Sequence, residues 1–250
     1  MSEIWQACAE RAAPIELAGT IHRLVESQEQ VATNALVTTL AEQALLEELL
    51  ERSKPPLDGA RPGLHYLLAT PFRYPPLPWG SRFGSRFEPS LFYAARNVET
   101  VLVEGAFYRF VFWTGMAVPP PAPLHTRHTV FAAEMRTARG LALHAAPFAA
   151  YESALTDPRD YTATQSLGRA LRAAGIEAFE YVSARDPRRG HNVALFTPRA
   201  FAAAEPARLD EWLCDTGAET VTFYSRHGGG FREYPVGTFL VDGSLPAPPR

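Results

Sequence analysis

One carboxylate interrupts an otherwise apolar stretch of this sequence, and three arginines precede it. Glu104 lies within VLVEGAF, while Arg73, Arg82 and Arg86 lie upstream in segments rich in turn residues. A carboxylate that is buried without a partner costs several kcal/mol or takes up a proton, so Glu104 needs a cation or hydrogen-bond donors. The sequence therefore predicts a Glu–Arg cluster, which either fixes packing or binds a ligand.

Two polar residues at the ends of predicted strands favour a ligand. Tyr93 and Ser183 each end an apolar run, and polar groups at strand ends that border a cleft commonly converge on a ligand. A cluster of Arg, Tyr, Glu and Ser suits a phosphate-bearing substrate whose reacting centre becomes cationic. Arginine would hold the phosphates, and the carboxylate would stabilise an oxocarbenium-like ribose.

Other kinds of chemistry lack candidates in this sequence. The single lysine, Lys54, lies beside two prolines, so neither a P-loop nor a Schiff-base mechanism is supported. No G-x-S-x-G motif is present, which disfavours a Ser/His/Asp hydrolase. His125 and His128 follow a Pro-rich loop and have no adjacent acid, so we expect solvated loop histidines and no metal site.

Charge and cysteine content limit the expected partners and compartment. The net charge of −3 gives no basic field for nucleic acid. Cys8 and Cys214 match no zinc or disulfide spacing, which fits a reducing cytosol. The N-terminus lacks the pattern of a signal peptide, and no apolar run reaches the roughly 18 residues of a membrane span. We expect a cytoplasmic protein without nucleic-acid or membrane partners.

Short strands and a few helices must position these side chains. Helical patterns cover 97–112, with Asn97 as the N-cap, 161–174, ending at Gly175, and 206–216. RHGGGF at 226–231 predicts a hairpin turn more strongly than an anion-binding loop. Because strands and helices do not alternate regularly, the expected fold class is α+β. The predicted strands are 64–70, 90–95, 129–135, 179–184, 192–198, 219–225 and 236–242.

The first 54 residues differ in charge from the rest of the chain. They hold four basic residues against nine acidic ones, and glycine occurs there only at Gly19. One apolar stripe (Leu17, Ile21, Leu24, Val25) and a second from Leu36 to Leu49 predict two or three amphipathic helices. They end at the Pro/Gly-punctuated linker RSKPPLDGARPG. The expected organisation is an N-terminal helical extension, 1–55, and a main domain, 60–250.

Three sequence blocks occur in a specific order. GSRFG at 80–84 contains Arg82, Tyr93 follows eleven residues later, and Glu104 follows after eleven more. DYTATQSLGRALRAAGIEAFEYVSAR leads from a helix into a strand ending at Ser183, and HNVALFTP supplies the next strand. With this order and spacing, the chain from about 64 to 240 resembles the RES-domain family, the toxins of RES–Xre toxin–antitoxin pairs. The Arg, Glu and Ser that name the family map onto Arg82, Glu104 and Ser183.

The resemblance implies a fold, a reaction and a partner. The fold would be similar to ADP-ribosyltransferases, and NAD⁺ would be a substrate, with no prosthetic group. The nicotinamide–ribose bond would be cleaved with water or phosphate as acceptor. An Xre-type helix-turn-helix antitoxin would block the cleft, and a homodimer within the toxin–antitoxin complex is left open. The alternatives are a protein ADP-ribosyltransferase and a catalytically silent binding module on the RES scaffold.

The resemblance also implies roles for the catalytic residues. Arg82 would bind the pyrophosphate, and Tyr93 would position the nicotinamide ribose. Glu104 would accept a hydrogen bond from a ribose hydroxyl and stabilise positive charge as nicotinamide departs. Ser183 would orient the substrate or Glu104.

Three further residues are predicted to bind the dinucleotide. Many family members carry a Tyr–Arg pair early in the domain, and here Arg73 and Tyr74 of PFRYPP would fill that space. Arg73 would join Arg82 on the pyrophosphate. Thr162 aligns with a small hydroxyl residue of the family's Asp-Trp helix and would contact the ligand near that helix N-terminus. Tyr161 stands where the family commonly has tryptophan.

Overall fold

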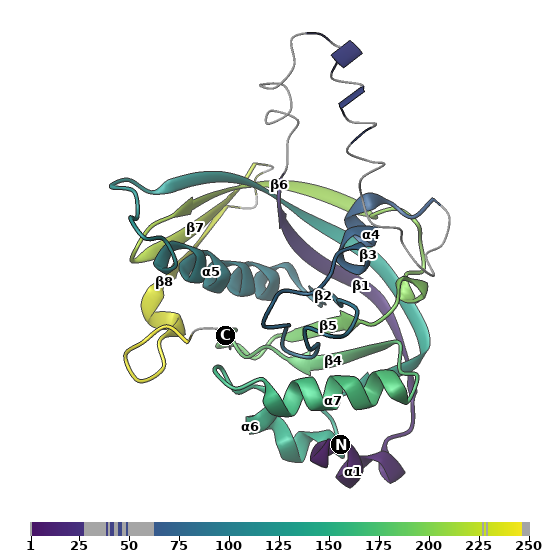
Figure 1. Ribbon diagram of the computed structural model, residues 1–250. Coiled ribbons are helices and arrows are strands. Elements are labelled where there is room, and N and C mark those ends of the chain that lie inside the picture. The colour runs from purple at the N-terminus through teal and green to yellow at the C-terminus, as the bar shows by residue number, and fades with distance from the viewer. Residues whose placement is uncertain are drawn as a thin grey trace.

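A mixed sheet organises the protein in the computed structural model, which describes residues 2–27, 39, 41–42, 45–46, 49, 63–226, 228 and 230–246. Within these ranges eight strands form one sheet in the order β1-β2-β5-β4-β3-β6-β7-β8 (Figure 1). β1 also pairs with β3, so the pairings among β1, β2, β5, β4 and β3 form a closed circuit. The strands are β1 Ile15–Glu26, β2 Phe92–Ala95, β3 Leu124–Ala142, β4 Ala178–Val182, β5 His191–Leu195, β6 Arg208–Thr216, β7 Thr220–Ser225 and β8 Phe231–Pro235.

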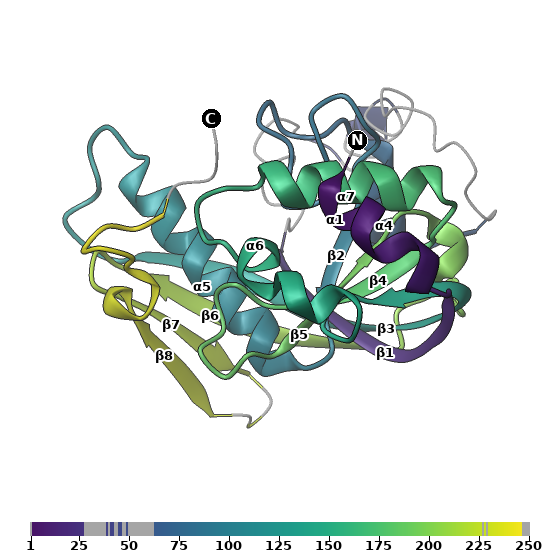
Figure 2. The ribbon, with the colours of Figure 1, turned by 90° about the horizontal axis from the view of Figure 1, so that it is seen from below.

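Helices cover the sheet in two groups. α1 and α7 lie side by side, as both ribbon views show (Figures 1 and 2). The short helix α6 contacts both α7 and β4. α5 crosses the part of the sheet formed by β6 and β7, where it packs in a shared core cluster. The helices are α1 Glu3–Cys8, α4 Tyr66–Arg73, α5 Val98–Thr114, α6 Glu152–Leu155 and α7 Thr162–Ala173, with 3-10 segments at Ala9–Arg11, Phe148–Tyr151, Pro198–Ala200 and Val236–Phe239. None of the described helices is long and apolar enough to cross a membrane.

The helix that carries Glu104 forms as predicted. The Asn97 side chain accepts a hydrogen bond of 2.8 Å from the Thr100 backbone N–H, which caps the first turn of α5. Residues on nearly every side of this helix are buried, including Leu102, Phe107 and Phe110. The central position of the helix explains why Glu104 must find its polar partners inside the fold.

Most of the predicted strands and the predicted 161–174 helix are confirmed. β2, β3, β4, β5 and β7 overlap the predicted strands, and α7 covers the predicted 161–174 helix. Gly175 follows α7 with a φ of +72°, a backbone conformation that glycine adopts without strain. β7 and β8 pair antiparallel around 226–231, as expected of a hairpin, although residues 227 and 229 lie outside the described ranges.

The predicted helix at Leu17–Val25 is wrong. Residues 15–26 form β1, which pairs antiparallel with β3 from Ile15 opposite Gly140 to Glu26 opposite His128. The alternation typical of a strand is hidden in the sequence because Gly19 occupies one position on the face of Leu17 and Ile21. This part of the expected extension therefore belongs to the sheet. The 1–55 and 60–250 boundary stays a prediction, because most of the second predicted helix and the linker lie outside the described residues.

Three other predicted elements are also wrong in type. The 206–216 segment contains β6, Arg208–Thr216, rather than a helix, with Trp212, Cys214 and Thr216 buried at every second position. The 64–70 segment begins α4, because His65 caps it by accepting a hydrogen bond of 3.2 Å from the Leu67 backbone N–H. The 236–242 segment contains a 3-10 turn. Pairing with β3 and β7 decided the strand conformation of β6, and the His65 cap decided the helical conformation of α4.

Candidate active site

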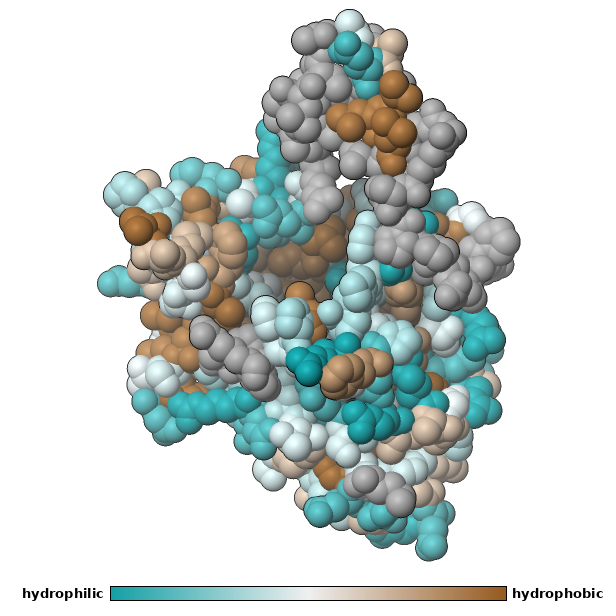
Figure 3. Space-filling model, viewed as in Figure 1, coloured by the Kyte–Doolittle hydropathy of each residue, from teal (hydrophilic) through white to brown (hydrophobic). Residues whose placement is uncertain are grey.

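A cavity of about 580 Å³ opens between β1, β2 and α5. Figure 3 shows a hollow with a hydrophobic floor where β1 runs between α5 and α4. The volume lies in the range of small-molecule binding sites. Arg82 and Glu104 both line the cavity, together with Tyr93 from β2. The structure therefore brings three of the predicted catalytic residues into one space.

Glu104 is held by two donors that come from different strands. The Ser183 hydroxyl, just after β4, donates a hydrogen bond of 2.6 Å to Glu104 Oε1. The Asn192 amide, on β5, donates a second hydrogen bond of 2.6 Å to the same oxygen. No described residue donates to Oε2. One carboxylate oxygen is thus fixed by the protein, and the other remains an acceptor for a ligand.

Ser183 is a buried positioning residue. Its Oγ accepts hydrogen bonds from the backbone N–H groups of Arg185, at 3.1 Å, and Asp186, at 3.0 Å. A hydroxyl has two acceptor lone pairs and one proton, so the proton is left for Glu104. Glu104 Oε1 must accept in this arrangement. Of the two roles predicted for Ser183, the geometry fits orienting Glu104.

Arg82 extends from a tight turn into the cavity wall. Ser81 N–H donates to Gly84 O across the turn at 2.7 Å, and Arg82 Nη1 donates to the carbonyls of Leu155, at 3.3 Å, and Asp157, at 2.8 Å. The guanidinium lies over the Tyr161 ring, 4.4 Å from its centroid. Nε and Nη2 have no hydrogen-bond partner among the described residues. This unpartnered edge has the fork geometry that binds phosphate oxygens in pairs.

Tyr93 supports the turn through its hydroxyl. That hydroxyl shares a hydrogen bond of 2.8 Å with Ser81 Oγ and accepts one of 3.0 Å from the Phe83 backbone N–H. Burial raises the pKa of Tyr93 to about 12, so the hydroxyl stays protonated at neutral pH. Tyr93 therefore positions the turn that carries Arg82, while its ring lines the cavity.

The other predicted binding residues lie elsewhere. Arg73 and Tyr74 lie at the C-terminal end of α4 and are not among the described residues that line the cavity. Thr162 begins α7, where its backbone N–H donates to Asp160 Oδ1 at 2.8 Å. Arg86 is exposed, with its guanidinium over the Phe87 ring. Neither Thr162 nor Arg86 is among the lining residues described.

The sequence reasoning missed several residues that line the cavity, among them Arg23, Arg185 and Asn192. Arg23 on β1 donates a hydrogen bond of 2.5 Å to the Tyr93 carbonyl oxygen. Burial lowers the pKa of Arg23 to about 10, which leaves the guanidinium protonated at neutral pH. Arg185 donates to the Pro158 carbonyl at 2.8 Å. Asn192 lies in the quoted HNVALFTP block, and Arg185 follows Ser183 by two residues, so both positions were within reach. Arg23 had no signal, because its strand was taken for a helix.

The cavity has an excess of positive charge. Arg109 forms an ion pair of 2.9 Å with Glu26, so those two lining charges offset each other. Arg23, Arg82 and Arg185 have no carboxylate partner among the described residues. Three guanidiniums against the single carboxylate of Glu104 favour an anionic ligand.

His128, in the cavity wall, should make stability depend on pH. It lies on β3, not in a loop as predicted, and burial and then the positive charge of Arg109 lower its pKa from 6.5 to about 4. Between these values the unfolded chain binds a proton that the folded chain does not, so stability falls as pH falls, by up to roughly 3 kcal/mol. The measurement is urea unfolding at pH 7 and pH 5 for wild type and His128→Gln. If the free energy of unfolding fell between pH 7 and pH 5 by no more in the wild type than in the variant, the lowered pKa of His128 would be contradicted.

Comparison with known protein families and solved structures shows what this chain is similar to. The family model described as RES domain matches residues 56–216. No curated protein matches. A solved chain from "Crystal structure of the M. tuberculosis MbcT-MbcA toxin-antitoxin complex" is similar at 12% identity with a TM-score of 0.47, covering 94% of this chain and 93% of that chain.

Proposed function

The chain belongs to the RES domain family, and from this membership and the cavity geometry we propose that it is an NAD⁺-cleaving toxin of a toxin–antitoxin pair. In the proposed reaction the bond between the nicotinamide nitrogen and ribose C1′ breaks, and nicotinamide leaves with the electron pair. Oxygen of water or phosphate then bonds to C1′ and releases its proton. The observation that carries the proposal is a fixed carboxylate and an arginine fork in the walls of one cavity.

Glu104 supplies the negative charge that this reaction needs. As nicotinamide departs, positive charge develops on the ribose, and a preorganised carboxylate stabilises it more than it stabilises neutral ribose. Ser183 and Asn192 fix Oε1, so Oε2 can accept from a ribose hydroxyl without reorganisation of the side chain. This division of the two oxygens supports a catalytic role over a packing role.

The arginines supply the binding site for the pyrophosphate. Arg82 presents Nε and Nη2, and Arg23 and Arg185 add positive charge from other walls of the same cavity. Charge-assisted hydrogen bonds from guanidinium to phosphate are among the stronger contacts in proteins. Tyr161, beneath Arg82, holds the guanidinium plane in place.

An exposed apolar rim supports an antitoxin partner. Leu77, Trp79, Tyr108 and Phe112 line the cavity and are each at least 40% exposed. Apolar side chains that gather around an opening commonly mark an interaction surface. We propose that an Xre-type antitoxin covers this rim and blocks access of NAD⁺.

The test is incubation of the purified protein with NAD⁺ while nicotinamide release is followed. Reactions with and without phosphate distinguish phosphorolysis from hydrolysis by the product, and labelled NAD⁺ added to a lysate reports transfer to proteins. We expect nicotinamide release without protein labelling. Labelling would favour the ADP-ribosyltransferase alternative, whereas neither release nor labelling would leave the silent binding module and overturn the proposal.

Removal of the Arg82 fork should weaken substrate binding. We expect Arg82→Ala to raise KM for NAD⁺ about 10–100-fold, because hydrogen bonds to charged groups contribute roughly 1.5–3 kcal/mol each. Steady-state kinetics on protein shown to be folded by circular dichroism measures the effect. Arg86→Ala is the matched control, since Arg86 is an exposed arginine four residues away and outside the cavity. Gross unfolding of Arg82→Ala would instead assign Arg82 a structural role.

A further inference from the structure

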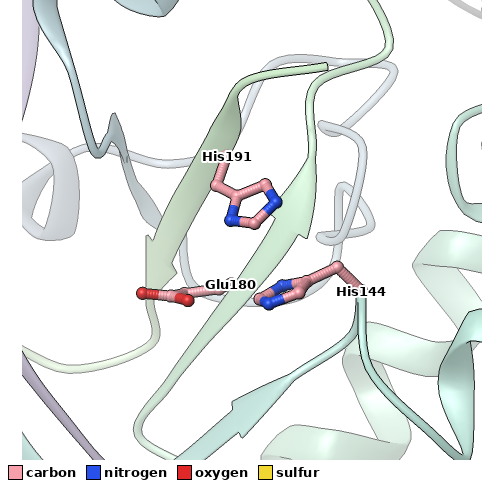
Figure 4. Close-up of side chains that lie close together, drawn as sticks. All are labelled: His144, Glu180 and His191. Carbon is pink, nitrogen blue, oxygen red and sulfur yellow. The ribbon is translucent and has the colours of Figure 1, made fainter.

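A second cluster of chemically active side chains lies outside the cavity. His144 follows β3, Glu180 lies on β4 and His191 begins β5, and Figure 4 shows the three side chains together. One potential ligand atom from each lies within 4.8 Å of the others, and all three residues are partly buried. Partial burial leaves a route for an ion from solvent.

The cluster and the cavity lie on opposite faces of the β4–β5 pair. Tyr181 and Asn192, which are opposite each other in the pairing, line the cavity. Their chain neighbours Glu180 and His191 point to the other face, because side chains alternate along a strand. The cluster is therefore not part of the proposed NAD⁺ site.

The structure assigns this cluster a role: we propose that His144, Glu180 and His191 bind a divalent transition metal ion of the zinc class. Two imidazoles and one carboxylate are the donor set that such ions commonly take in proteins, with a fourth position left for water. His144 Nδ1 is buried and has no hydrogen-bond partner among the described residues, so this nitrogen is available as a metal ligand.

The side chains need only local rotation to complete the site. A tetrahedral ion with bonds of about 2.0–2.1 Å holds its ligand atoms roughly 3.3 Å apart, so the three atoms must move closer together. The His144 and His191 rings are now stacked, with centroids 4.1 Å apart and an interplanar angle of 28°.

Arg96 opposes the metal and gives the proposal a distinctive signature. Its Nε and Nη2 both contact Glu180 Oε1, which leaves Oε2 as the ligand atom. Arg189 is the other cation near His191 and pairs with Glu152. A neighbouring guanidinium lowers the affinity of a site for cations by charge repulsion. Removing Arg96 should therefore tighten metal binding, which a nonspecific histidine site elsewhere on the surface would not show.

A bound ion would tie β4, β5 and the segment after β3 together. Ser183 follows β4 and Asn192 lies on β5, so the ion would stiffen the strands that hold Glu104 from the other side. Binding to the folded chain alone also raises its stability by mass action. With zinc about 100-fold above its Kd, the expected rise in Tm is roughly 5 °C for a chain of this size.

The experiment measures binding directly, without reference to enzymatic activity. Chelator-treated protein is titrated with Zn²⁺ against a chromophoric chelator and with Co²⁺ by visible absorption. We expect one equivalent bound, with affinity lowered roughly 10–100-fold or more in His144→Gln and His191→Gln. His125→Gln is the matched control, since His125 is an exposed histidine beside Asp215 and should bind as wild type does. Arg96→Gln should bind more tightly than wild type.

Two results would overturn the proposal. One is the absence of saturable binding to folded wild-type protein. The other is binding that persists at wild-type affinity in both His144→Gln and His191→Gln, which would place the ion elsewhere. Because glutamine keeps most of the side-chain volume, circular dichroism should show both variants folded. Either result leaves the proposed NAD⁺ cleavage untouched, because none of the three residues lines the cavity.

Discussion

Glu104→Gln should lower kcat for nicotinamide release roughly 10²–10³-fold while KM for NAD⁺ changes little. The amide is neutral and cannot stabilise the positive charge that develops on the ribose. Its oxygen can still accept both hydrogen bonds that Ser183 and Asn192 now donate to Oε1. The substitution therefore removes charge from the cavity and leaves packing intact. Initial-rate kinetics, with thermal unfolding of the same samples, separates the two effects.

Glu99→Gln is the matched control for this experiment. Glu99 lies on the same helix, but its carboxylate accepts hydrogen bonds from Arg232, at 2.8 and 3.0 Å, outside the cavity. Its substitution should leave kcat unchanged. If Glu104→Gln were as active as wild type, the assignment of the catalytic carboxylate would be wrong even if NAD⁺ were cleaved.

Gly168→Ala should lower Tm by roughly 2–4 °C and also reduce activity. A Cβ at this position of α7 would lie 1.9 Å from the Phe83 carbonyl oxygen and 2.8 Å from its carbon, so helix and turn must separate. Alanine favours a helix interior by about 1 kcal/mol over glycine. Overpacking against backbone costs about 1–3 kcal/mol or more, and here it should exceed that gain. Because Phe83 follows Arg82, displacement of the turn should also move the Arg82 fork.

Gly237→Ala provides the comparison for stability. Nothing lies within 4 Å of a Cβ built at Gly237, and its φ is not positive. This substitution should change Tm by little, or raise it slightly through the smaller entropy of the unfolded chain. Differential scanning calorimetry of both variants is the measurement. If both glycine variants had the same Tm as the wild type, α7 would not be in close contact with the turn.

The sequence predicted the local elements around Glu104 because their signals are local. The Asn97 side chain caps α5 by accepting a hydrogen bond from the backbone N–H of Thr100, three residues away. Gly175 ends α7 through its own backbone conformation. Such features depend on a few consecutive residues and can be recognised without knowing the fold. The same reasoning failed for β1 and β6, because their hydrogen bonds come from β3, which is distant in sequence.

The candidate site was predicted in composition and only partly in arrangement. Arg82, Tyr93 and Glu104 line one cavity, and the Ser183 hydroxyl donates a hydrogen bond to Glu104. The sequence did not indicate that the Tyr93 hydroxyl is used to hold the turn. Nor did it place Arg73, Tyr74 or Thr162 outside the cavity, because these three residues were assigned from their resemblance to family positions and not from the packing of this chain.

By itself, the sequence determined that a carboxylate had to be buried on an apolar helix and that arginine was nearly the sole cation to meet it. The tertiary structure decided which groups meet that carboxylate: Ser183 and Asn192 reach Glu104 from 79 and 88 residues away. It likewise decided that His144, Glu180 and His191 gather on the other face of the same strands. The physical reason is that strand pairing sets which distant residues become neighbours, and pairing depends on partners that no short segment of sequence contains.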